Sequence, residues 1–274
     1  MEAISFLSGN IRGWAGPDRD GEHAWSYRAP LYASLLEDRT PHLVGFQEFQ
    51  EANLADLQPA LPFHACVLGR ECGIGQYVPL FWDTRRFECL RTESFWLSDS
   101  PESKAIGWDA NNERAVTWAE LQDLGSDRAL LVINTHFDHV GEEARIRSTH
   151  LILDLVARWP IETPIIILGD FNSSPYHPIR GTLYTGRSFG LFADAGFMDA
   201  YRSHTGVWPP PAIFHDYQGE AYVPDQYGTW YIDWPLTRNL RVRTAEIVRH
   251  HQGSLPLSDH YPVYVTVTYA DATW

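Results

Sequence analysis

Short apolar runs alternate with longer amphipathic stretches along the chain, and this pattern predicts a mixed α/β protein. Ile165–Leu168 is short, β-branched and bounded by Pro164 and Gly169, which is typical of a β-strand. The run lacks strict alternation with polar residues, which indicates a strand covered on both faces. Glu142–Trp159 carries apolar residues at helical spacing and predicts an amphipathic helix.

The same patterns predict the other elements. Helices are expected over Trp25–Asp38 and Leu54–Leu61. Single strands are expected over Ile4–Ile11, Leu43–Phe46, Tyr231–Leu236, Arg241–Val248 and Tyr261–Tyr269. Two strand pairs are expected, Val78–Trp82 with Phe87–Leu97 and Ala115–Leu121 with Ala129–Thr135. Antiparallel pairs mixed with helical crossovers exclude an all-parallel barrel and favour two mixed β-sheets packed face to face under helices. Without repeats or a clear linker, residues 1–274 are expected to form a single domain.

Polar residues stand where the predicted strands end. Asp170 and Asn172 follow the Ile165–Leu168 strand, and on an extended chain their side chains would project together. A simple Asx turn leaving the strand is the plainer alternative. Other such residues are Asn10, Glu48, His136, Asp233 and the run Ser258-Asp259-His260. Each alone has a structural explanation as a turn, a cap or a core histidine. Strand ends in a layered fold share one rim, so their joint occurrence predicts a ligand site there.

Composition narrows the function. The net charge is −14 and Lys104 is the only lysine, which argues against tight binding of long nucleic acid. A local arginine pocket could still hold one small anion. Three cysteines without a CxxC spacing argue against a disulfide framework or a cysteine zinc site. MEAISFLSGNIRG does not resemble a signal peptide and no apolar run reaches membrane-spanning length, so a soluble, cytoplasmic protein without an indicated partner protein is expected.

Seven short motifs carry a family resemblance. They are GNIRG (9–13), FQEFQ (46–50), RAVTW (114–118), NTHFDHVGEEAR (134–145), GDFNSSP (169–175), YIDW (231–234) and SDHYPV (258–263). In this order they resemble the endonuclease/exonuclease/phosphatase (DNase I-like) superfamily. NTHFDHVGEEAR is most similar to a bacterial branch of small metal-dependent hydrolases. The family fold is a four-layer α/β sandwich, which agrees with the elements predicted above.

The resemblance implies a metal-dependent hydrolase acting on phosphoester bonds. Such a reaction needs an activated water, an in-line approach, charge stabilisation and a protonated leaving group. The resemblance implies that Glu48, with Asn10 and Asp259, holds Mg²⁺ or Mn²⁺, and hard oxygen donors suit these cations. It further implies that Asp170 orients or deprotonates the attacking water. Asn172 matches a donor to a phosphate oxygen.

The resemblance also assigns the basic residues of the site. It implies that His260 contacts the phosphate, with Asp233 fixing the imidazole ring. His136 would be a second donor and the general acid, and Arg114 matches an arginine that faces the phosphate. His139 is expected to bind substrate.

The chain departs from the family pattern at two places. In GIGQYVPLFWD (73–83), Gln76 stands where relatives usually have a glutamate that pairs with the histidine matching His136. An amide supplies no charge to stabilise an imidazolium, so His136 is predicted to be a weaker acid, and Gln76 is expected to face the substrate site. In FHDYQGE (214–220), relatives tend to have a glycine after the histidine, and His215 is expected to line the substrate pocket.

The expected function is hydrolysis of a small or medium organic phosphate ester, either a phosphomonoester or a phosphodiester. One alternative is a nuclease for short or single-stranded nucleic acid. Another is a catalytically altered member that acts on a non-phosphate substrate or only binds, which Gln76 favours. Tryptophans near the rim could stack on a ring, although core packing is the commoner role: Trp14, Trp108, Trp208, Trp230 and Trp234.

Overall fold

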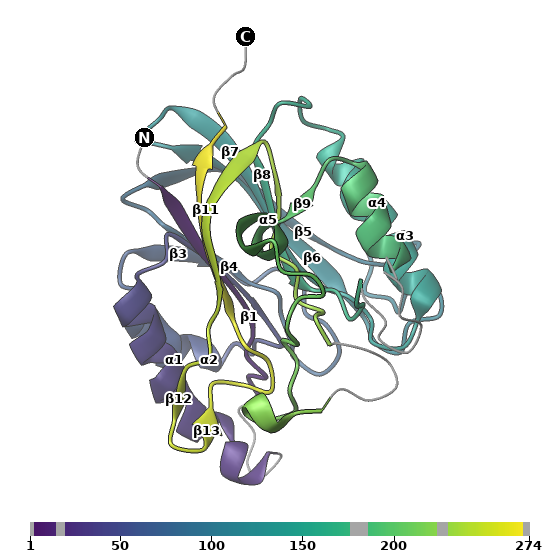
Figure 1. The fold of residues 1–274 in the computed structure, drawn as a ribbon. Helices are drawn as coiled ribbons and strands as arrows, with labels where there is room; N and C mark the ends of the chain where they lie inside the picture. Colours follow the sequence, from purple (N-terminus) through teal and green to yellow (C-terminus); the bar gives the residue numbers. More distant parts are fainter. Residues whose placement is uncertain (1–2, 15–19, 176–185, 224–229, 271–274) are drawn as a thin grey trace.

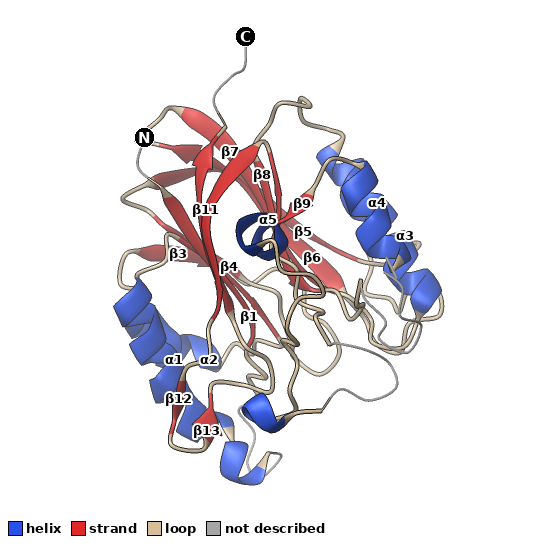
Figure 2. Cartoon of the chain, viewed as in Figure 1, coloured by secondary structure: helices blue, strands red, loops and turns tan. Residues whose placement is uncertain are grey.

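The computed structural model describes residues 3–14, 20–175, 186–223 and 230–270. Two six-stranded mixed sheets pack face to face, and helices cover the outer face of each (Figure 1, Figure 2). Helices α1 (Trp25–Arg39) and α2 (Asn53–Leu57) lie on one side, and α3 (Glu142–Val156) and α4 (Arg187–Asp194) on the other (Figure 1). The predicted α/β sandwich is therefore confirmed. Every helix among the described residues is too short or too polar to cross a lipid bilayer.

The first sheet has the strand order β11-β14-β1-β2-β4-β3. Its strands are β1 (Ile4–Asn10), β2 (Leu43–Gln47), β3 (His64–Val67), β4 (Leu80–Asp83), β11 (Leu240–Ile247) and β14 (Val263–Tyr269). Strands β1 and β2 are parallel and the other pairs are antiparallel. The parallel pair ends on Asn10 and Gln47, which are partners in register. The residues that follow β1 and β2 therefore lie at the same edge of the sheet.

The second sheet has the order β5-β6-β7-β8-β10-β9. Its strands are β5 (Phe87–Trp96), β6 (Ala115–Asp123), β7 (Arg128–His136), β8 (Ile165–Asp170), β9 (Met198–Asp199) and β10 (Leu236–Arg238). Strands β7 and β8 are parallel, with His136 opposite Asp170. The remaining short elements of the described residues are α5 (Ala200–Thr205), the hairpin of β12 (His251–Gln252) and β13 (Leu255–Pro256), and the 3₁₀ turns Gly21–His23, Gln58–Ala60 and Gly219–Ala221.

The facing sheets enclose the main core and approach each other closely at Gly45. Side chains of β1 alternate, with Phe6 facing the core between the sheets and Leu7 packing in the cluster formed with α1. A Cβ at Gly45 would stand 2.7 Å from the Leu168 side chain, so only glycine permits this approach. Asn134 bridges the sheets there, donating to the carbonyls of Phe46 and Pro79. Asn134 is therefore a structural part of the NTHFDH motif.

Two strand predictions are wrong in detail. Val78–Trp82 and Phe87–Leu97 do not pair, because β4 pairs with β2 and β3 on its two edges and leaves none for β5. The expected strand Tyr231–Leu236 is mostly a coil that wraps the end of β8, and only β10 extends from it. The other predicted helices and strands are confirmed to within a few residues. Strands β3 and β9 and helices α4 and α5 were not expected from the sequence.

Candidate active site

A cavity of about 460 Å³ opens at the edge where the parallel strands of both sheets end. Its size falls within the usual range for small-molecule sites. Nine of the residues predicted from the sequence line it: Glu48, Gln76, Arg114, His136, His139, Asp170, Asn172, Asp259 and His260. Asn10 and Asp233 lie directly behind this lining and bond to it. The strand-end residues are therefore brought together as the sequence predicted.

Asp170, at the end of β8, is the centre of the site. Its Oδ2 lies 3.0 Å from Asn10 Nδ2, 3.5 Å from His136 Nε2 and 3.9 Å from His260 Nε2. Burial raises the pKa of the Asp170 carboxyl, and the nearby charge of Asp233 raises it further. A buried carboxylate with a raised pKa is suited to accept a proton from a bound water.

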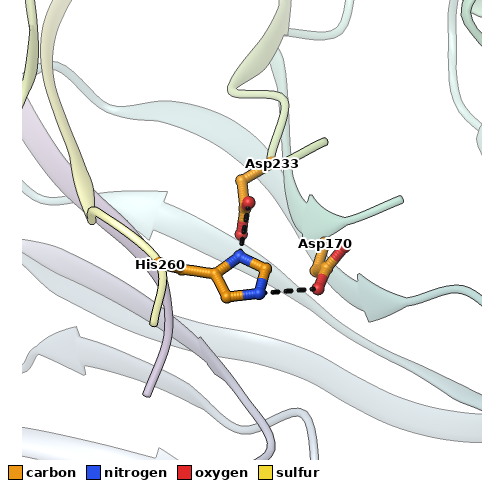
Figure 3. Close-up of side chains that lie close together, drawn as sticks. All are labelled: Asp170, Asp233 and His260. Carbon is orange, nitrogen blue, oxygen red and sulfur yellow. Dashed lines mark hydrogen bonds and ion pairs between the residues drawn. The ribbon is translucent and has the colours of Figure 1, made fainter. Parts of the chain in front are cut away.

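His260 is held between two carboxylates (Figure 3). Its Nδ1 lies 2.8 Å from Asp233 Oδ2, and its Nε2 faces Asp170. Burial by itself lowers the pKa of His260, but the charges of Asp233 and Asp170 and the hydrogen bond to Asp233 outweigh it and raise the pKa to about 10. The ring of Phe214 packs edge-on against the imidazole at 5.1 Å between centroids. His260 is therefore a shielded imidazolium near neutral pH.

His136 and Asn172 form a second pair. The amide nitrogen Nδ2 of Asn172 donates to the carbonyl of Phe137 (2.9 Å) and lies 3.0 Å from His136 Nε2. The amide is the donor in both contacts, so Nε2 of His136 acts as an acceptor. Burial lowers the pKa of His136 well below its ordinary value, and the charges of Arg114 and His260 lower it further. A neutral, accepting His136 fits the holding of Asn172 better than the expected role as general acid.

The GDFN sequence was expected either to project Asp170 and Asn172 together or to form an Asx turn, and the structure has features of both. The backbone N–H of Asn172 donates to Asp170 Oδ1 at 2.9 Å, which is the Asx turn of the plainer alternative. Asn172 has a φ of 47°, so the chain is not extended and the expected parallel projection is wrong in detail. Both side chains nevertheless line the same cavity.

Glu48 is fixed by two neutral amides. Its Oε1 accepts from Asn10 Nδ2 at 3.1 Å, and its Oε2 accepts from Gln76 Nε2 at 3.2 Å. Among the described residues, no hydrogen bond joins Gln76 to His136, so the pairing expected between them is wrong. Glu48 has a φ of 53°, a conformation that costs a non-glycine residue about 1–3 kcal/mol and is concentrated at functional sites.

Asn10 presents its amide nitrogen to the site. Nδ2 donates to both Glu48 and Asp170, while Oδ1 accepts from the backbone N–H of Arg12 at 3.0 Å. If the amide were flipped, Nδ2 would face the N–H donor of Arg12, and Oδ1 would face the carboxylates of Glu48 and Asp170. Asn10 therefore bonds to both carboxylates through its amide nitrogen, and the expectation that its side chain is a metal ligand stays a prediction.

Arg12 is a site residue that sequence reasoning missed. Its Nη1 lies 3.1 Å from Asp259 Oδ2 and its Nη2 lies 3.2 Å from Asp20 Oδ1. Asp259 Oδ1 accepts from the hydroxyl of Ser258 at 3.0 Å. The available signal was an arginine two residues after the strand-end asparagine in GNIRG. Asp259 thus reaches the cavity as half of an ion pair, unlike Glu48.

Arg114 and His139 form a basic wall of the cavity. Arg114 is 7% exposed, with Nε 3.7 Å from Asp138 Oδ2 and Nη2 3.3 Å from His139 Nδ1. Asp138 is held by the backbone N–H groups of Asn111, Asn112, Val140 and Gly141. These bonds lower the pKa of Asp138 despite its burial, so its negative charge anchors Arg114. The guanidinium is positioned to meet an anion.

His215 does not line the cavity, which corrects the expectation that it contacts substrate. It is 1% exposed, its Nδ1 accepts from the backbone N–H of Gly219, and its ring lies 4.0 Å from that of Tyr261. Burial, and the charge of His260, lower its pKa to about 4, so it is a neutral packing residue.

The cavity lining also has an apolar part, and sequence reasoning missed most of it. Its members are Ile74, Phe214, Trp230 and Ile232. Of the rim tryptophans that the sequence suggested, Trp230 alone lines the cavity within the described part of the chain. Trp234 is fully buried and stacks on Phe171, and Trp208 packs near Phe189. Segments 15–19 and 224–229, beside Trp14 and Trp230, lie outside the described residues.

The donor set fits a hard divalent cation. The carboxylates of Glu48, Asp170 and Asp259 line one cavity, and no cysteine is among the described residues that line it. Asp170, Asp233 and His260 also bring ligand atoms within 4.8 Å of one another. In that group, however, Nδ1 of His260 is already bonded to Asp233 Oδ2 at 2.8 Å, whereas the Glu48 carboxylate is bonded by two neutral amides. The cation position that fits is therefore on the Glu48 side of Asp170.

Several known proteins are similar to this chain in sequence or fold. No family model matches the chain. Uncharacterized protein L388 of Acanthamoeba polyphaga mimivirus is 26% identical over 162 residues, covering 55% of this chain and 60% of the viral protein's length. Among solved structures, an endonuclease/exonuclease/phosphatase from Bacteroides vulgatus is 29% identical, with a TM-score of 0.84 over 98% of this chain and 100% of its own.

Two further solved structures share the fold at lower identity. A mannosyl-6-phosphatase from Bacteroides thetaiotaomicron is 24% identical, with a TM-score of 0.82 over 97% of this chain and 100% of its own. TDP2 from D. rerio, solved with a single-strand DNA product, is 16% identical, with a TM-score of 0.72 over 98% and 100% of the two chains. The fold and the strand-end site thus define the class of protein. The chain belongs to the endonuclease/exonuclease/phosphatase superfamily, as its motifs predicted.

Proposed function

We propose that the chain is a divalent-metal-dependent phosphoesterase that hydrolyses a small or medium organic phosphate ester. The observation that carries the proposal is Asp170 Oδ2, which lies within 4 Å of Asn10 Nδ2, His136 Nε2 and His260 Nε2 at the base of the cavity. Membership of the superfamily supports a phosphoester hydrolase in general, because its solved members include a mannosyl-6-phosphatase and TDP2 in complex with a single-strand DNA product.

The residues divide the chemistry between them. Asp170 accepts the proton of the attacking water, and its raised pKa suits it to this task near neutral pH. His260, as an imidazolium, stabilises the negative charge that develops on the phosphoryl oxygens, and Asp233 keeps its ring oriented. Arg114 binds the phosphate oxygens, while both amide hydrogens of Asn172 are already donated to Phe137 and His136.

Glu48 and Asp259 are the residues that would hold Mg²⁺ or Mn²⁺, with Asn10 and Gln76 fixing Glu48. When bound, the cation would supply Lewis-acid polarisation of a phosphoryl oxygen. Among the described residues, no ion pair joins Glu48 to a cationic side chain, so its carboxylate stays available to a cation. In this reading His136 serves to orient Asn172, and leaving-group protonation falls to a water or to His260.

The cavity and the surface charge support a compact substrate. A cavity of about 460 Å³ with a partly apolar lining fits one phosphate and a small organic group. A net charge of −14 opposes the long phosphate backbone of duplex DNA. A nuclease acting on short single-stranded ends is the second candidate, favoured by Trp230 and Phe214, whose rings could stack a base.

A substrate panel tests the proposal. Sugar phosphates, aryl phosphodiesters, lipid phosphoesters, short single strands and duplex DNA would be assayed with Mg²⁺ and Mn²⁺, with Glu48→Ala and Asp170→Asn purified in parallel. We expect turnover of a small phosphoester that both substitutions and excess EDTA abolish. Full activity in EDTA, or equal activity in Asp170→Asn, would contradict the proposal. Preferential cleavage of single strands would favour the second candidate, and tight duplex binding that weakens steeply with salt would refute the preference for small substrates.

A further inference from the structure

A short hairpin carries Gln76 to the site. Cys72 and Gln76 exchange two backbone hydrogen bonds, of 2.7 and 3.0 Å, around the turn Gly73-Ile74-Gly75. Both glycines have positive φ, of 51° and 77°, which glycine alone adopts without strain. The next residue, Tyr77, pairs with Phe49 through backbone bonds of 2.7 and 3.3 Å. Since Phe49 and Tyr77 follow Glu48 and Gln76 directly, this bridge fixes the two side chains beside each other.

The contact that results is between a neutral donor and a carboxylate. Gln76 Nε2 donates to Glu48 Oε2 at 3.2 Å, while Asn10 Nδ2 donates to Oε1 at 3.1 Å. Each oxygen thus has one amide partner and a remaining lone pair. Asp259, in contrast, is paired with the guanidinium of Arg12. Amide donors restrict the orientation of Glu48 without neutralising its charge, which is what a cation ligand requires.

We propose that Gln76 is a positioning residue for Glu48: it holds the carboxylate in the orientation that a divalent cation needs, and it does not act through His136. The inference rests on the proposed function, because it requires Glu48 to be a cation ligand. Partners that orient a metal ligand typically change metal affinity by about 10–100-fold when substituted. The role accounts for an amide at position 76, since a carboxylate there would oppose the charge of Glu48 whenever the cation is absent.

The test measures Mn²⁺ binding rather than activity alone. Mn²⁺ would be titrated into the full chain and the free ion followed by electron paramagnetic resonance. Gln76→Met keeps the size of the side chain and removes the donor. Gln122→Met is the matched control, because Gln122 also donates to a carboxylate, Asp127 at 2.9 Å, in the turn between β6 and β7. Glu48→Ala shows whether the Mn²⁺ that binds in the titration occupies the site at Glu48.

We expect Gln76→Met to weaken Mn²⁺ binding by about 10-fold, with Gln122→Met unchanged and Glu48→Ala without binding at this site. Saturating Mn²⁺ should return the turnover of Gln76→Met to near that of the wild type. Gln76→Glu should lower the melting temperature in EDTA, and Mn²⁺ should restore it, which a purely structural role would not produce.

Two results would overturn the inference in different ways. If Gln76→Met binds Mn²⁺ as the wild type does while Glu48→Ala does not bind, Gln76 has no positioning role and the metal site stands. If Glu48→Ala binds Mn²⁺ as tightly as the wild type, the cation site of the proposed function fails and the inference fails with it.

Discussion

The carboxylate oxygen Oδ2 of Asp233 lies 2.8 Å from Nδ1 of His260, and both residues are at least 95% buried. Asp233 reaches this position because the coil after Trp230 wraps the end of β8, where Asp233 bridges to Asp170. The other oxygen of Asp233, Oδ1, has no hydrogen-bond partner among the described residues. The carboxylate therefore binds His260 alone, and its function depends on that one contact.

Asp233→Asn tests this pair. The amide keeps the shape but loses the charge that stabilises the imidazolium, so kcat should fall by roughly 10²–10⁴-fold. Mn²⁺ affinity should stay within a few-fold of the wild type, because Asp233 orients His260 and is not a cation ligand. Steady-state kinetics and a Mn²⁺ titration on the same protein separate the two roles. Loss of Mn²⁺ binding would place the cation in the Asp170–Asp233–His260 group instead.

Asp170 and His260 act on one transition state in this account. Asp170→Asn and His260→Gln should each reduce kcat/KM severely, and the double variant should lose little more than the worse single variant. The comparison is a double-mutant cycle at saturating Mg²⁺, with melting temperatures showing that each protein is folded. Multiplicative losses would indicate two independent contributions rather than one shared site.

Asp199, which lies outside the active site, should make the stability of the fold depend on pH. It caps α5 through the backbone N–H of Arg202 (2.7 Å) and accepts from the Tyr231 hydroxyl (2.8 Å). Burial raises its pKa to about 6, above the 3.8 of an unperturbed group. The folded state then holds the proton more tightly than the unfolded chain does, so this group stabilises the fold most below pH 3.8. That contribution is lost as the pH rises toward 6.

Asp199→Asn should remove this dependence. The free energy of unfolding of the variant should fall less than that of the wild type between pH 4 and 7, by on the order of 1–3 kcal/mol. Urea denaturation at several pH values measures the difference. Parallel curves for the two proteins would show that Asp199 titrates normally in the fold.

Arg28 bonds to the two loops of the site at Asn10 and Asp259. Its guanidinium is fully buried and donates to the carbonyls of Ile11 and Leu257 at 2.7 and 2.9 Å, and also to those of His23 and Arg12. Arg28→Met should leave these buried carbonyls without a donor and lower the free energy of unfolding by about 3 kcal/mol or more. Arg39→Met on the same helix removes an exposed ion pair with Glu246 and the contact of the guanidinium with the Tyr264 ring, 5.4 Å from its centroid, and should lower the free energy of unfolding by only about 1–2 kcal/mol.

Thermal and urea unfolding measure the stability lost in Arg28→Met and in Arg39→Met. The remaining activity of Arg28→Met shows whether the loops at Asn10 and Asp259 have moved. Because Ile11 follows Asn10 and Leu257 precedes Asp259, Arg28→Met should also lower kcat at temperatures where it is folded. Equal stability of the Arg28 and Arg39 variants would contradict the assigned role.

The sequence predicted the layers and the strand-end residues because both depend on local patterns. Apolar runs identified β1, β2, β7 and β8, and polar residues at their ends identified Asp170, His136 and Glu48. The sheet to which β5 belongs could not be predicted, since it depends on which strand edges remain free after long-range pairing. The single-domain organisation stays a prediction.

Details of the site depended on contacts that no local pattern encodes. Which atom of Asn10 faces the carboxylates is decided by the N–H of Arg12, and Gln76 reaches Glu48 through a bridge between residues 49 and 77. His215 looked like a site residue by its motif, yet its ring packs against Tyr261. The sequence identified which residues gather at the cavity more reliably than the partner of each.

Hydrolysis at phosphorus, dependent on a cation and on Asp170, is the central claim. The most direct measurement is turnover of the best substrate of the panel in ¹⁸O-labelled water with Mg²⁺, with the products followed by ³¹P NMR. We predict that one labelled oxygen appears on the phosphorus of the product, and that EDTA or Asp170→Asn abolishes its formation. Label in the alcohol product instead, or undiminished turnover in EDTA, would contradict the account.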